Sequence, residues 1–210
     1  LGNLGLFSHK IFFQLHGITT EKKKELISDF KKNKKINWIA ECSGNFDLIV
    51  ALLCKNIKEF DTEKNKILQK YCQYILHYNV GIMSETRIFN RDYLIDKESS
   101  QELFLIGDPK QIVIDKKDKK ILALLSIDSR IPTIEIAKQT KLNIRTVVSR
   151  IKILQNSGII QAYKVFLDLS KIGYNFYKAF IVINKMDKSK YKEFISYCRL
   201  NRNIIHLVEN

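Results

Sequence analysis

Apolar positions recur with two different periods along the first half of the chain. Four runs rich in β-branched and aromatic residues predict strands, and two runs with apolar residues three and four apart predict helices. The strands are expected at 9–17, 36–43, 47–54 and about 77–89, and the helices at 20–33 and from 56 onward. This βαββαβ order predicts an α+β fold of ferredoxin-like type over residues 1–94, with both helices on one face of an antiparallel sheet. Self-association would cover the other face.

The apolar positions within these helices predict which residues form the core. The inward side of the first helix is Leu26, Ile27 and Phe30, and the second helix is expected to open with a capping box of Asn56 and Glu59. Its apolar stripe consists of Phe60, Ile67, Leu68 and Tyr71. A connector, 95–114, follows with the breakers Ser99-Ser100 and Gly107-Asp108-Pro109 around a short strand-like run at 103–106.

Three short helical patterns precede Gly158 in the next expected domain, residues 115–168. Asp115, with Asp118 three residues later, should cap the first, whose core face is Ile121, Leu122, Leu124 and Leu125. Thr133 should cap the second, Lys141-Leu142 should form a tight turn, and Asn143 should cap the third. The third pattern has an apolar stripe and ends at Gly158, and a strand is expected over 159–168. The stripe comprises Val147, Val148, Ile151 and Leu154. This pattern predicts a three-helix, winged helix-turn-helix domain.

The polar side of the third helix carries the candidate chemistry. Arg145, Ser149 and Lys152 fall on one side, Thr146 and Arg150 flank them, and no acid occurs between Asn143 and Gly158. Such donors suit phosphate oxygens and major-groove base edges, so we expect a recognition helix. The expected DNA-binding residues are Asn143, Arg145, Thr146, Ser149, Arg150 and Lys152. Lysines of the first helix, at 116, 117, 119 and 120, would lie nearer phosphates. The alternative is a solvated basic face on an ordinary packed helix.

The positive net charge favours an acidic partner, but it does not show where that partner binds. The net charge is +14, yet the excess is spread over the whole chain. The four cysteines are widely spaced without a C-x-x-C pair, which predicts buried thiols in a reducing compartment and neither a metal site nor a cofactor. No apolar run approaches the roughly 18 residues of a membrane span, so we expect a cytoplasmic protein.

The chain also repeats itself at a distance of 168 positions. Residues 1–42 align without a gap on 169–210, with 12 identities, among them Gly5 with Gly173 and Asn33 with Asn201. The repeat predicts that 169–210 begin a second ferredoxin-like domain, and that the sequence is a fragment of a longer protein. Chance similarity of two lysine-rich segments is the alternative.

The stretch from Ile114 through the third helix resembles the leucine-responsive (Lrp/AsnC) family of transcription regulators. The resemblance lies in an Asp-x-x-Asp helix start, a D-x-R-I loop at 128–131, the T-V-x-x-R-I-x-x-L recognition helix and a G-I-I-Q-x-Y exit. The first domain resembles the effector-binding domain of that family, whose G-x-[FYW]-D turn matches Gly44-Asn45-Phe46-Asp47. The tandem order is similar to double-length members known mainly from archaea.

The resemblance implies a sequence-specific regulator that binds double-stranded DNA, responds to a small molecule such as an amino acid, and forms homo-dimers or higher oligomers. It implies effector contacts at Gly44, Asn45, Phe46 and Asp47, and Glu41 beside them could meet an amino group. In the structural alternative, Gly44 allows the turn, Phe46 packs in the core and Asp47 caps a backbone N–H group.

Two other functions remain open. Siroheme decarboxylases are enzymes with a similar two-domain layout, but the four histidines, His9, His16, His77 and His206, form no recognisable cluster in the sequence. Low-specificity architectural DNA binding would depend on charge more than on base reading. We expect a regulator and not an enzyme.

Overall fold

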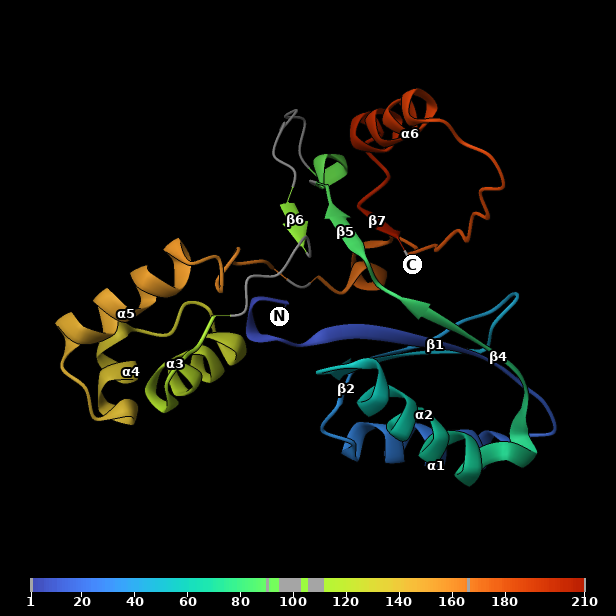
Figure 1. Cartoon of the computed structure of the whole chain (residues 1–210), viewed down its shortest axis with the longest axis horizontal. Helices are drawn as coiled ribbons and strands as arrows, with labels where there is room; N and C mark the ends of the chain where they lie inside the picture. The colour runs from blue at the N-terminus through green and yellow to red at the C-terminus, as the bar shows by residue number, and fades with distance from the viewer. Residues whose placement is uncertain (1, 90, 95–102, 106–111, 166, 210) are drawn as a thin grey trace. The chain divides into compact units, whose positions relative to one another are not determined.

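The computed structural model describes residues 2–89, 91–94, 103–105, 112–165 and 167–209. They divide into two compact units, which we describe separately (Figure 1). The first contains strands β1 to β4 with helices α1 and α2, and the second contains helices α3 to α6.

The first unit is a ferredoxin-like sheet with two helices. Its elements are β1 (Phe7–Leu15), α1 (Thr20–Lys32), β2 (Ile36–Glu41), β3 (Leu48–Cys54), α2 (Ile57–Tyr71) and β4 (Ile75–Ile82). The strand order is β2-β3-β1-β4, and the three pairs of neighbours are antiparallel. Both helices lie on the same side of the sheet (Figure 1). The predicted βαββαβ order and the predicted placement of the helices are confirmed.

One hydrophobic cluster holds this unit together. From the sheet come Ile11, Phe13, Val50 and Leu52, and their exposed fractions are at most 1%. From the helices come the predicted stripe residues, which are buried or partly buried. These are Leu26, Ile27, Phe30, Phe60, Ile67, Leu68 and Tyr71. Burying one such side chain fully contributes roughly 1.5–3 kcal/mol, so the apolar stripe of each helix determines which side of the helix packs against the sheet.

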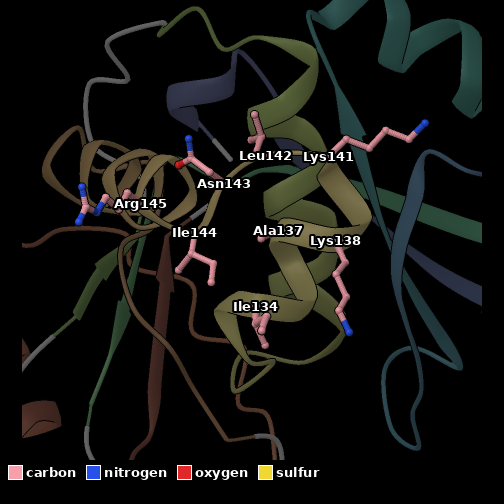
Figure 2. Close-up of a pocket in the computed structure, with 8 residues that line it drawn as sticks. All are labelled: Ile134, Ala137, Lys138, Lys141, Leu142, Asn143, Ile144 and Arg145. Carbon is pink, nitrogen blue, oxygen red and sulfur yellow. The ribbon is translucent and has the colours of Figure 1, made fainter.

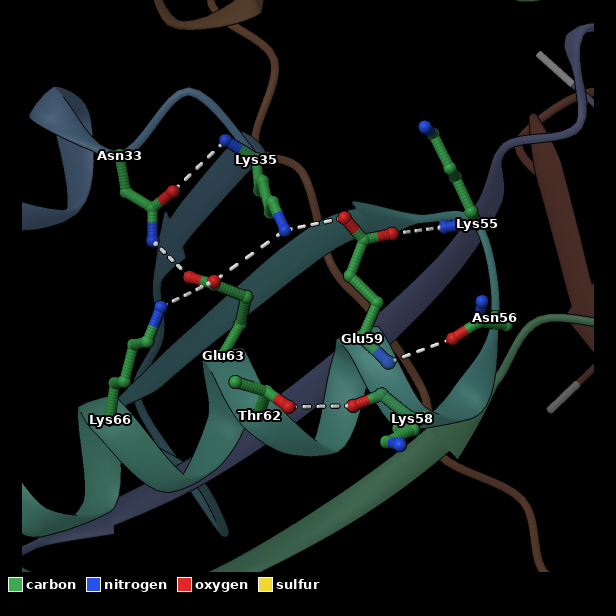
Figure 3. A network of polar contacts seen from close by, with 9 residues as sticks. All are labelled: Asn33, Lys35, Lys55, Asn56, Lys58, Glu59, Thr62, Glu63 and Lys66. Carbon is green, nitrogen blue, oxygen red and sulfur yellow. Dashed lines mark hydrogen bonds and ion pairs between the residues drawn. The ribbon is translucent and has the colours of Figure 1, made fainter.

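A network of polar contacts joins α2 to the start of β2 (Figure 3). The Asn56 side chain accepts a hydrogen bond from the Glu59 N–H at 2.9 Å, so the predicted cap is confirmed. The Glu59 carboxylate does not accept a hydrogen bond from the Asn56 N–H, which a capping box requires. It accepts from the Lys55 N–H at 2.6 Å and from the Lys35 ammonium at 2.5 Å. The predicted box is therefore half formed, because a lysine brought near by the fold competes for the acid.

The strand predicted over about 77–89 is wrong as a single element. The structure has β4 there and, after a break at residues 83–84, a second strand, β5 (Glu85–Ile88). This second strand belongs to a three-stranded sheet of order β6-β5-β7, formed with β6 (Leu103–Leu105) and β7 (His206–Glu209). The alternation of side chains continues across the break, so the pattern could not show a change of strand partner. The short strand expected in the connector is confirmed as β6.

The second unit contains the three helices of the predicted helix-turn-helix. They are α3 (Lys116–Ile127), α4 (Thr133–Thr140) and α5 (Ile144–Asn156). Ile121, Ile136, Val147 and Leu154 are buried, with exposed fractions of at most 2%, and supply one core residue or more from each helix. A fourth helix, α6 (Lys188–Leu200), lies further along the chain.

Segments 168 positions apart in the sequence also share backbone geometry. Helices α1 and α6 begin and end at positions that differ by 168, and so do their capping residues, Thr19 with Asp187 and Asn33 with Asn201. Gly5 and Gly173 both have positive φ, at 70° and 80°. A turn, two caps and a whole helix therefore recur at the offset of 168 positions that the sequence alignment gave.

Two predicted strands do not form. Residues 159–165, expected to lead away from the third helix as a wing, and residues 175–183, the counterpart of β1 in the repeat, are all described and lie in no strand. A strand needs neighbours to satisfy its backbone groups, and β1 has β3 and β4 on its two sides. The described residues supply no such neighbours for 175–183. Strand-forming composition was therefore not sufficient.

Candidate nucleic-acid interface

The turn between α4 and α5 has the geometry that the sequence predicts. Lys141 adopts the left-handed conformation with φ of 57°, and the next N–H, from Leu142, donates to the Ala137 carbonyl at 3.1 Å. The Asn143 side chain then accepts from the Thr146 N–H at 2.7 Å and caps α5. Figure 2 shows Lys141, Leu142 and Asn143 around the hollow at this turn.

The start of α4 differs from the prediction. Pro132 occupies the cap position, and Thr133 is already the first residue of the helix, without a side-chain capping bond. The prediction that Thr133 caps this helix is wrong, because a capping hydroxyl must come from the non-helical residue before the first turn. Pro132, with φ fixed near −58°, sets the entry to the helix instead.

The end of α5 follows the expected pattern. Gly158 has φ of 71°, its N–H donates to the Gln155 carbonyl at 2.9 Å, and the Ile159 N–H donates to the Leu154 carbonyl at 3.0 Å. These two bonds form a Schellman cap, which favours glycine at the left-handed position. The recognition helix therefore has a defined beginning and a defined end.

The inward face of α5 is narrower than predicted. Val147 and Leu154 are buried and Ile151 is half-buried, but Val148 is 51% exposed. The assignment of Val148 to the buried stripe is wrong, because a short helix packed against two others buries only the residues nearest their axes. Val148 adds an apolar group to the outer surface, and such groups can contact thymine methyls.

The polar face of α5 points away from the core. Asn143, Arg145, Ser149 and Lys152 are exposed and Thr146 is half-buried. A second hollow runs along this face, lined by Asp118, Arg145, Thr146, Ser149, Arg150 and Ile153. Apart from the amide oxygen that Asn143 uses as a cap, these exposed side chains can turn their donors toward a ligand.

Arg150 differs from the other predicted contacts because it is held inside the domain. Its Nη1 donates to Asp115 Oδ2 at 2.7 Å and to Asp118 Oδ1 at 2.8 Å. Asp115 caps α3 as predicted, and the two aspartates together form a capping box at its start. The pKa of Asp115 is lowered first by the Asp118 N–H and then by the Arg150 guanidinium, while both carboxylates raise the pKa of Arg150.

The residues expected to bind an effector have structural contacts in the first unit. Asp47 Oδ2 accepts from the Leu15 N–H at 2.7 Å, and the Phe46 ring lies 5.3 Å from the Phe12 ring. Gly44 has φ of 120°, a conformation that side-chain-bearing residues rarely adopt. Glu41 pairs with Lys23 at 3.0 Å, whereas Asn45 is exposed. These contacts agree with the structural alternative for Gly44 and Asp47, whereas Phe46 is half-buried and does not belong to the core cluster.

The histidines and cysteines do not form a metal-binding group among the described residues. His9 is buried against the Phe60 ring, and His16, His77 and His206 are exposed. No three metal-ligating side chains lie together within the described part of the chain. The four cysteines are thiols that form no disulfide; Cys54 and Cys198 are buried as expected, Cys42 is half-buried, and Cys72 is exposed. None of the described helices is long and apolar enough to cross a membrane.

Comparison with known proteins identifies the three-helix segment. Residues 114–155 match the family model of the AsnC-type helix-turn-helix domain. These residues are therefore an AsnC-type helix-turn-helix segment. An uncharacterized HTH-type transcriptional regulator of Pyrococcus abyssi is 43% identical over 63 residues, which are 30% of this chain and 43% of that protein. The regulator LrpA of Pyrococcus horikoshii is 41% identical over 63 residues, 30% of this chain and 45% of its own.

The chain therefore covers less than half the length of these two HTH-type regulators. Among solved structures, the siroheme decarboxylase NirDL aligns with 75% of this chain and 44% of its own, at 15% identity and a TM-score of 0.48. At that level of similarity the alignment does not distinguish an enzyme from a regulator.

Proposed function

We propose that this Lrp/AsnC-type chain is a sequence-specific DNA-binding transcription regulator whose α5 enters the major groove. The observation that carries the proposal is the outer face of α5. It presents exposed Arg, Lys, Ser and Asn side chains without an acid of its own, on a helix with a fixed start and end. The AsnC-type match over the same residues supports it.

Within this proposal the side chains have different roles. Arg145, Thr146 and Ser149 are near the start of α5 and face outward, so they are placed to reach base edges. Asn143 keeps its amide N–H groups for DNA while its oxygen caps the helix. Lys152 and the exposed lysines of α3 would contact phosphates, which fix the register of the protein on the duplex.

The remaining parts of the proposal concern assembly and regulation. The ferredoxin-like part of residues 1–94 would mediate homo-oligomers and respond to a small molecule, with an amino acid as the first candidate. Gly44, Asn45, Phe46, Asp47 and Glu41 would lie near that site. Residues 169–210 would begin a second ferredoxin-like domain after the DNA-binding segment 115–168 and the connector 95–114, and the protein would act in the cytoplasm. The repeated helix and caps support this arrangement.

The test is selection of duplexes from a random library, followed by fluorescence anisotropy on the selected sequence. Arg145→Ala should weaken binding by roughly 1–3 kcal/mol and relax the preference at one base position, if Arg145 makes a bidentate contact with guanine. Lys24→Ala removes one positive charge from the exposed side of α1 and is the matched control, with little effect expected.

Two results would contradict the proposal. Absence of duplex binding at low ionic strength would remove the DNA-binding function. Tight binding with steep salt dependence and no sequence preference would replace a specific regulator with an architectural DNA-binding protein.

A further inference from the structure

We propose that Arg150 is a positioning residue, which holds the recognition helix against α3 through Asp115 and Asp118 and does not read bases. This inference rests on the proposed DNA-binding function, and it changes the set of residues expected to carry sequence specificity. The fold brings together a cation and two carboxylates that are 32 and 35 residues apart in the chain.

The hydrogen bonds of the guanidinium limit what else it can bind. Both N–H groups of Nη1 are directed to carboxylates, one to Asp115 and one to Asp118. The Nε atom is buried and has no hydrogen-bond partner among the described residues. A bidentate guanine contact needs two neighbouring N–H groups on one edge of the guanidinium. On one edge Nη2 neighbours Nη1, which is already bonded to the carboxylates, and on the other it neighbours Nε, which is buried. Arg150 therefore cannot make the contact for which arginine is best suited while these bonds persist.

The charges favour keeping the bonds when DNA arrives. Asp115 and Asp118 together carry two negative charges at the start of α3, and Arg150 supplies the only side-chain cation with a described ion pair to either of them. Moving the guanidinium to a phosphate would leave both carboxylates unpaired beside a polyanion. Asp118 also lines the same hollow as Arg145 and Ser149, so its charge would act directly on the reading face.

The contact also sets the rotation of α5 about its own axis. Arg150 follows Ser149 directly and lies five residues after Arg145, so tying Arg150 to α3 fixes the direction in which these two side chains project. The two aspartates are themselves held by the capping box, in which the Asp118 N–H donates to Asp115 Oδ1 at 2.7 Å. Specificity is then read by Arg145, Thr146 and Ser149, with Arg150 acting through their placement.

The experiment compares Arg150→Gln with Arg145→Gln, which removes the same charge from the same helix. Binding of the selected duplex is measured by anisotropy between about 50 and 200 mM salt. A positioning role predicts that Arg150→Gln weakens binding roughly tenfold but leaves the slope of log K against log salt unchanged. Arg145→Gln should instead relax the preference at one base position. Arg150→Lys, which can still pair with one carboxylate, should restore part of the affinity.

A second measurement, made without DNA, tests the contact itself. The thermal midpoints of Arg150→Gln, Asp118→Asn and the double variant form a double-mutant cycle, and the double variant should lose less than the sum of the two single losses. Additive losses would overturn the proposal, and so would a salt slope reduced by about one in Arg150→Gln, which marks a lost phosphate contact. The cycle needs no DNA. A protein that does not bind duplex DNA would therefore contradict the proposed function, and the cycle would still show whether Arg150 and Asp118 interact.

Discussion

Asp47 allows a direct test of whether the turn at residues 44–47 serves the fold or a ligand. Its carboxylate accepts the Leu15 N–H at 2.7 Å, and its own N–H donates to the Phe13 carbonyl at 2.9 Å, so it joins the end of β1 to the start of β3. A hydrogen bond to a charged acceptor contributes roughly 1.5–3 kcal/mol. Because Asp47 is half-buried and water can partly replace the bond, we expect Asp47→Ala to cost about 1.5 kcal/mol, near the lower limit of that range.

Urea unfolding followed by the fluorescence of Trp38 gives the measurement. Trp38 is the single tryptophan of the sequence and lies in β2 of the same sheet, so its signal reports this unit. With a slope near 1–2 kcal/mol per molar urea, the midpoint should fall by about 1 M. Asp47→Asn keeps an oxygen acceptor without the charge, and it should lose about half as much stability.

Glu25→Ala is the control, because it removes an acid from an exposed pair with Lys22 on α1 and should change stability by less than about 1 kcal/mol. An unchanged midpoint in Asp47→Ala would refute the structural role. If the same variant also lost a response of DNA binding to an added amino acid, Asp47 would belong to an effector site.

Three further predictions concern packing, the helix end and pH. Val147→Ala should destabilise the helix-turn-helix by roughly 1–3 kcal/mol, whereas Val148→Ala, at a position 51% exposed, should have little effect; thermal unfolding followed by circular dichroism compares them. Gly158→Ala should cost about 1 kcal/mol, because φ of 71° strains any side chain, and an unchanged midpoint would contradict the described cap. Burial lowers the pKa of His9 below its ordinary 6.5, so the unfolded state binds a proton more readily. Stability of the first unit should therefore decrease as pH falls below about 6.5, and His9→Phe should remove this dependence in urea titrations at pH 5 and 7.

The local pattern was sufficient to predict elements whose stability is decided nearby. Helices α1, α2, α3 and α5 begin close to their expected residues because a capping side chain, an apolar stripe and a breaker all lie within a few positions of one another. The same reasoning located the exposed basic side of α5, since a helical period fixes which residues share a face.

Predictions failed where the outcome depends on a distant partner. Residues 159–165 and 175–183 have strand-like composition but pair with no described strand. Strands β4 and β5 belong to different sheets although the alternation of side chains continues from one to the other. Val148 is exposed although it belongs to an apolar run, because two neighbouring helices determine how wide the buried face of α5 can be.

Sequence by itself thus determined the two kinds of fold and the helix that carries the candidate DNA-binding face, because helix periods and caps are short-range properties of the chain. Only the tertiary structure showed which cations of that helix are ion-paired within the protein. Arg150 and Arg145 look alike in the sequence, yet folding brings two carboxylates to Arg150, and none of the described ion pairs involves Arg145. Charge pairing over more than thirty residues depends on how the helices pack, and no local pattern encodes it.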